Sequence, residues 1–117
     1  MKPIYKIWTA YVLLILFMLI AGTSFSQVQI AVFNAEWNES NKVEWVHELK
    51  DVNTISYIDV SKDVELQKKH KIAVVPTIII FKDDEEVARF QADLSFKMAA
   101  TREEVQEEID NQLMSDF

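Results

Sequence analysis

The sequence predicts a single α/β domain, in which a four-stranded mixed sheet is flanked by helices and follows an N-terminal apolar segment. The chain has 117 residues, of which 50% are hydrophobic, and this suffices for one core but not for two. After residue 26, apolar residues alternate between strand and helix spacing in the order β-α-β-α-β-β-α. The last two strands are too close in sequence to be parallel, so the sheet is expected to be mixed.

The first 26 residues have the layout of a secretory signal peptide. Lys2 and Lys6 precede the apolar run Ile7–Gly22, and small residues stand at Ser24 and Ser26. Cleavage after Ser26 is therefore predicted, which makes residues 1–26 a signal peptide.

Residues 27–117 are then an exported, periplasmic or secreted domain. The alternative is an uncleaved membrane anchor formed by residues 7–25, because about 18 to 20 apolar residues suffice to span a bilayer.

A β-α-β unit is predicted at the start of the domain. Val28–Phe33 is β-rich and apolar, as in a buried strand, and a polar loop over Asn34–Ser40 follows. Asn41–Asp51 is predicted to be an amphipathic helix capped by Ser40 or Asn38. Its apolar residues recur three and four apart, at Val43, Trp45, Val46, Leu49 and then Val52. Ile55–Val60 is the second strand.

Three further elements complete the domain. Ser61 is predicted to cap a short charged helix over Lys62–His70. Strands at Ile78–Phe81 and Val87–Phe90 are predicted to form a hairpin around an acidic turn, Asp83, Asp84 and Glu85. Thr101 and Glu104 have the spacing of a capping box at the start of a last helix. Its apolar face is Val105, Ile109 and Leu113.

Two segments of the domain resemble the thioredoxin-like family. Residues 33–42 read FNAEWNESNK, which is similar to the family's active-site pattern F-x-A-E/D-W-C-x-x-C-K. Residues 70–77 read HKIAVVPT and are followed by an apolar strand, which resembles the family's cis-proline segment V-x-x-x-P-T. The resemblance covers about residues 28–114 and implies a thioredoxin-like fold, with Pro76 in the cis configuration.

The departures from the family pattern concern its chemistry. Asn38 and Asn41 stand where the family has its two cysteines, and the chain contains no cysteine at all. Disulfide exchange needs a thiolate to attack a disulfide sulfur and a second thiol to resolve the mixed disulfide. The family's buried acid is matched by Val32. The sequence therefore predicts a redox-inactive protein that is not an enzyme.

The resemblance also implies a groove where an extended peptide pairs with the backbone before Pro76. The groove is expected to be formed by seven residues: Trp37, Asn38, Glu39, Ser40, Asn41, Val75 and Pro76. The function predicted from it is non-catalytic peptide or protein binding, or a chaperone-like role. One alternative is that Trp37 and Pro76 serve the fold alone. Another is that the protein is a structural or accessory subunit of an exported or membrane-associated complex and uses another face, such as the last helix.

Other functions are disfavoured by composition. A net charge of −7 and a pI near 4.7 argue against nucleic acid as a partner. His47 and His70 lack the spacing of metal ligands, so neither a metal nor a cofactor is expected. With its single glycine at position 22, the chain has no phosphate-binding glycine loop. An enzyme of another chemistry would need an acid-base or nucleophile set that the sequence does not display.

Overall fold

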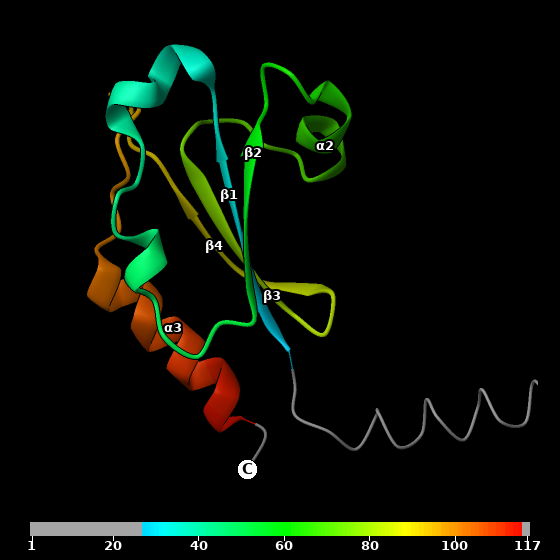
Figure 1. The fold of residues 1–117 in the computed structure, drawn as a ribbon, viewed down its shortest axis with the longest axis vertical. Coiled ribbons are helices and arrows are strands. Elements are labelled where there is room, and N and C mark those ends of the chain that lie inside the picture. The colour runs from blue at the N-terminus through cyan, green and yellow to red at the C-terminus, as the bar shows by residue number, and fades with distance from the viewer. Residues whose placement is uncertain (1–26, 116–117) are drawn as a thin grey trace, which may run out of the picture.

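The computed structural model describes residues 27–115 of the chain (Figure 1). The predicted signal peptide, its cleavage position and the alternative anchor at residues 7–25 lie outside these described residues. Within residues 27–115, no helix combines the length and the apolar character that a membrane crossing requires.

Four strands form one mixed sheet, which confirms the predicted fold class. The strand order is β2(Thr54–Asp59), β1(Val28–Asn34), β3(Thr77–Lys82), β4(Glu85–Gln91). β1 and β2 are parallel, whereas β3 is antiparallel to both β1 and β4. β2 is thus an edge strand of the sheet, and β4 is the other.

The two faces of the sheet carry two separate apolar clusters. The alternation of side chains along β1 sends Val28, Ile30 and Val32 to one face and Ala31 and Phe33 to the other. Figure 1 shows α3(Arg102–Met114) and the segment between β1 and β2 over one face, with α2(Val64–Lys69) on the opposite side. The first face is completed by fully buried residues of β3 and α3: Ile78, Ile80, Val105 and Ile109.

The N-cap of α2 differs from the prediction. Asp63 caps the helix, because its Oδ1 accepts a hydrogen bond of 3.1 Å from the Leu66 N–H. Ser61 lies too far upstream to do so. It instead donates from both its backbone N–H and its hydroxyl to Asp59 Oδ1.

The hairpin turn and the last helix follow the sequence signals. Asp83 and Asp84 both have positive φ, 52° and 68°, which is the geometry of a two-residue type I′ turn. Aspartate tolerates this left-handed region better than most residues do, so the turn forms without glycine. Thr101 caps α3, with its Oγ1 accepting from the Glu104 N–H at 3.2 Å.

The predicted helix over Asn41–Asp51 is wrong. The structure has two short 3-10 helices instead, η1(Glu36–Asn41) and η2(Val46–Glu48), and the backbone turns extended at Lys42 and Leu49. The apolar spacing did identify the inward residues, because Val46 and Leu49 are buried. β-branched valines, tryptophan and asparagine are weak helix formers, so burial alone does not complete a regular helix here.

Candidate functional site

Asn38, at the first of the two positions where the thioredoxin-like pattern has a cysteine, is the polar centre of the site. It is buried, with 3% of its surface exposed, inside η1. Its Nδ2 lies 3.1 Å from Asn34 Oδ1, 3.1 Å from the Phe96 carbonyl oxygen and 3.4 Å from the Val75 carbonyl oxygen. One carboxamide therefore joins the end of β1, the loop before Pro76 and the loop between β4 and α3.

The side chains of Asn38 and Asn41 are joined to each other by a hydrogen bond. Asn41 Nδ2 donates to Asn38 Oδ1 at 2.9 Å. This hydrogen bond links the two positions as a disulfide would, but a pair of amides cannot take part in thiol–disulfide exchange. It also satisfies the Asn38 oxygen, and every buried side-chain polar atom of the described residues has a partner.

The Asn38 amide group faces more acceptors than it can fully serve. An amide nitrogen carries two hydrogens, and three oxygens lie within range of it. The Val75 carbonyl is the most distant of the three, so its bond is the weakest. The peptide bond that follows this carbonyl, Val75–Pro76, is cis.

A small cavity of about 190 Å³ lies beside this loop, and we call it the groove cavity. Trp37 and Phe96 line it from one side, with their rings edge to face at 90° and 5.2 Å between centroids. Its remaining lining residues come from the end of β2, from α2 and from the loop before Pro76: Val60, Ser61, Gln67, Ile72, Ala73, Val74 and Val75.

Phe96 is held at the cavity by a tight loop. Asp93 Oδ1 accepts from the Ser95 N–H, the Ser95 hydroxyl and the Lys97 N–H. These bonds also lower the pKa of Asp93, with the Ser95 hydroxyl as the largest cause. Phe96 has a φ of 62°, a left-handed conformation that is unusual for an aromatic residue and that is often found at ligand-binding positions.

Similarity to solved structures identifies the architecture. A mutant thioredoxin from Halobacterium salinarum superimposes with a TM-score of 0.58 at 24% identity, over 74% of this chain and 75% of that one. Thioredoxin 1 from Thermosipho africanus superimposes with a TM-score of 0.57 at 22% identity, over 75% of this chain and 97% of that one. No protein-family model matches the chain, and no curated protein matches it.

The chain has the thioredoxin fold. Thioredoxin-2 of the malaria parasite, described as a component of its protein secretion machinery, shares this fold at 18% identity and a TM-score of 0.57, over 74% of this chain and 84% of that one. Identities at this level establish the architecture and not the activity. Because the chain has no cysteine, this thioredoxin fold lacks the dithiol of thiol-disulfide exchange.

On this thioredoxin fold, the seven predicted groove residues occupy four different environments. Trp37 and Val75 line the groove cavity, whereas Glu39 lines a second cavity described below. Asn38 and Pro76 are buried behind the surface. Ser40 is exposed and Asn41 is half-buried, and neither lines either of these two cavities. Phe96 was missed, because no motif of the sequence links it to residue 37.

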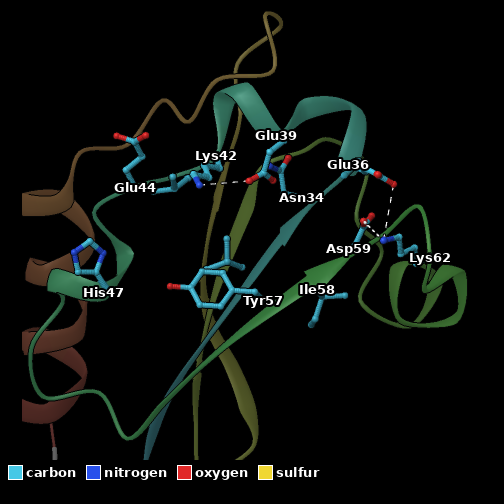
Figure 2. Close-up of a pocket in the computed structure, with 13 residues that line it drawn as sticks. Asn34, Glu36, Glu39, Lys42, Glu44, His47, Tyr57, Ile58, Asp59 and Lys62 are labelled. Atoms are coloured by element: carbon cyan, nitrogen blue, oxygen red, sulfur yellow. Dashed lines mark ion pairs between the residues drawn. The ribbon is translucent and has the colours of Figure 1, made fainter.

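The second, larger cavity has a volume of about 910 Å³ and lies between the sheet and residues 42–48 (Figure 2). We call it the sheet cavity. Val32 and Tyr57 form part of its apolar lining, and Tyr57 projects from β2 toward the side where His47 lies. No sequence pattern indicates this cavity, because the helix predicted over Asn41–Asp51 would have covered this part of the sheet.

Charged residues surround the sheet cavity. Lys42 pairs with Glu39 at 3.4 Å, and Lys62 lies 3.9 Å from Glu36 and 4.0 Å from Asp59. The pKa of the Asp59 carboxyl is lowered, mainly by the hydrogen bond from the Ser61 hydroxyl. Asp59 lines the sheet cavity and Ser61 lines the groove cavity, so this hydrogen bond runs between the two.

Neither cavity has the composition of a metal site. Across residues 27–115, no three histidine, aspartate or glutamate side chains are grouped so that they could hold a metal ion. His70 packs between the rings of Phe33 and Phe81, each with its centroid 5.5 Å away. His47 is exposed at the sheet cavity.

Proposed function

We propose that this protein is a redox-inactive thioredoxin-fold module of an exported compartment, which binds an extended peptide or protein segment at the groove cavity without catalysis. The observation that carries the proposal is the exposure of Trp37. Its side chain lies beside the groove cavity with 64% of its surface in contact with solvent. A large aromatic residue exposed beside a cavity is typical of a binding hot spot.

The loop between β4 and α3, which carries Phe96, exposes two large apolar side chains. Phe96 is 42% exposed, and Leu94, two residues earlier in the same loop, is 98% exposed. Soluble monomers seldom expose several large apolar side chains together unless a partner covers them. The loop is held by Asp93, so its aromatic side chain is presented at little entropic cost on binding.

The backbone beside the groove cavity supports the binding of an extended chain. Within residues 27–115, the Val75 carbonyl receives only the long contact from Asn38, and a carbonyl oxygen can accept two hydrogen bonds. No hydrogen bond is formed by the Val75 N–H among the described residues. A peptide in extended conformation can pair with both groups in the manner of an added strand.

The test is selection of peptides from a displayed library on the full-length chain, kept soluble in a mild detergent. Trp37→Ala and Phe96→Ala are expected to weaken the selected peptides by about tenfold or more. Tyr57→Ala is the matched control, because Tyr57 is equally exposed, at 64%, and lies on the other cavity.

Peptides that bind all three variants as they bind the parent chain would contradict the proposal. An insulin reduction assay is expected to show no turnover for any variant, since the chain has no thiol. The alternative role as an accessory subunit predicts a stable assembly in native extracts that is insensitive to Trp37→Ala.

A further inference from the structure

The outer edge of β2 is an unprotected strand edge. Among the described residues, β2 pairs only with β1, so alternate backbone N–H and C=O groups along its other side have no strand partner. Natural sheets usually protect such an edge with lysine, proline or a bulge. The sequence of β2, TISYID, contains no lysine and no proline, and its pairing with β1 is regular over six residues.

The sheet cavity opens beside this edge. Tyr57, Ile58 and Asp59 of β2 are among its lining residues. Tyr57 lies opposite Val32 in the β1–β2 register, so both side chains are on the face that the sheet cavity occupies. A strand added at the β2 edge would place every second side chain next to Tyr57 and over this cavity.

The excess of carboxylates at the sheet cavity favours a basic partner. Four carboxylates line the sheet cavity, Glu36, Glu39, Glu44 and Asp59, against the two ammonium groups of Lys42 and Lys62. Three of these carboxylates pair with the two lysines, whereas Glu44 forms no ion pair within the described part of the chain. Tyr57 and Glu44 both line this cavity, so a lysine or arginine side chain that packs on the Tyr57 ring brings its positive charge into a cavity with an unpaired carboxylate.

A second copy of the chain fits this edge less well than a basic segment does. The chain has 19 acidic and 12 basic residues, so two copies repel each other. The same charge attracts an extended segment with a lysine or arginine at alternate positions and apolar residues between them. The apolar residues would face the other side of the sheet, where Ile58 is half-buried against the second cluster.

We propose that the β2 edge and the sheet cavity form a docking surface for an extended basic segment of a partner protein, which adds to the sheet as a fifth strand. This surface is separate from the groove cavity and does not depend on the function proposed for it. Main-chain hydrogen bonds supply affinity, and Tyr57 and Glu44 supply the preference for basic residues.

The test uses a fluorescent peptide of alternating lysine and valine and the full-length chain in mild detergent. Binding is read from fluorescence anisotropy at low and high salt. Tyr57→Ala and Glu44→Lys are each expected to weaken binding at least about threefold, and high salt should weaken it further. Trp37→Ala should leave binding unchanged. Thermal unfolding of each variant verifies that it is folded.

Two control peptides separate strand addition from simple charge attraction. One replaces every lysine by glutamate, and it should not bind. The other keeps the lysines but carries methyl groups on alternate backbone nitrogens, which removes the hydrogen bonds of an added strand; it should also fail.

The proposal is overturned if the methylated peptide binds as well as the parent peptide, or if the glutamate peptide does. It is also overturned if Trp37→Ala abolishes binding while Tyr57→Ala and Glu44→Lys do not, since the peptide then occupies the groove cavity. Sedimentation that shows a dimer dissociated by Tyr57→Ala would assign the edge to a second copy and would overturn the basic partner.

Discussion

The two halves of the segment between β1 and β2 are held by different forces. In η1, the carboxamide of Asn38 has hydrogen bonds to three other parts of the fold. Residues 42–50 lack such a centre and depend on the buried side chains of Val46 and Leu49. Hydrogen bonds are directional and apolar contacts are not, so the first half is fixed in orientation, whereas the second half bridges the sheet and leaves the sheet cavity beneath it.

The largest expected loss of stability comes from a substitution in the apolar half, residues 42–50. Leu49→Ala should lower the free energy of unfolding by about 3 kcal/mol, because it empties a buried position of the main cluster. Chemical denaturation followed by tryptophan fluorescence measures it. The matched control is Glu48→Ala, which removes only an exposed ion pair with Arg102 and should cost less than about 0.5 kcal/mol. Equal losses would mean that Leu49 is not an anchor.

The next largest loss of stability is expected from a substitution in the hydrogen-bonded half, η1. Asn38→Ala should cost about 2 kcal/mol, because it leaves the Asn41 amide and the Phe96 carbonyl without their buried partner. Asn41→Ala removes a single hydrogen bond and should cost about 1 kcal/mol. Urea denaturation compares the two variants. If Asn41→Ala were the more destabilising change, Asn38 would not be the centre of the network.

A smaller effect tests a pair of hydrogen bonds that joins residues 42–50 to α3. Gln106 lies on α3, and its Oε1 accepts a hydrogen bond of 2.8 Å from the Lys50 N–H. Its Nε2 donates to the Lys50 carbonyl at 3.1 Å. Gln106→Ala should cost about 1 kcal/mol and should speed hydrogen exchange at the Lys50 amide. Glu107→Ala, on the exposed side of the same helix, is the control and should leave that exchange rate unchanged.

The smallest effect concerns the Asp59–Ser61 hydrogen bond between the two cavities. The lowered pKa of Asp59 means that its contribution to stability is present above the pKa of the unfolded chain and is lost as pH falls through the folded value. Ser61→Ala should raise this pKa toward that of an ordinary aspartate, about 3.9. Carbon NMR of the carboxyl groups measures it. The pKa of Asp93, held by Ser95, should not move.

The strands and the last helix could be predicted because their signals are local. Nearly continuous runs of β-branched and other apolar residues located β1 and β3, and the acidic turn at Asp83, Asp84 and Glu85 located the hairpin. The helix predicted over Asn41–Asp51 failed for a physical reason. Apolar spacing reports which side chains face the core, and several backbone conformations satisfy the same burial. Ser61 was predicted to cap α2, but the carboxylate of Asp63, two residues later, is the one that accepts the hydrogen bond from the Leu66 N–H.

The candidate site could be predicted only where it follows the chain. Residues 37–41 and 75–76 were found through two linear motifs. Phe96 joins them from 58 residues beyond Asn38, through a carbonyl that any residue type would supply, so its sequence carries no signal. The sheet cavity could not be predicted either, because it lies where the helix predicted over Asn41–Asp51 does not form.

The domain makes its sharp turns without glycine, and this bears on how it responds to heat. Asp51, Lys71, Asp83, Asp84 and Phe96 all adopt positive φ, whereas the only glycine of the chain is at position 22. Side chains at these turns narrow the conformations open to the denatured chain, so less entropy opposes folding than in a domain with glycine there. Each residue held in the left-handed conformation costs some enthalpy in return. With both the entropy and the enthalpy of unfolding reduced, the free energy of unfolding should change less steeply with temperature.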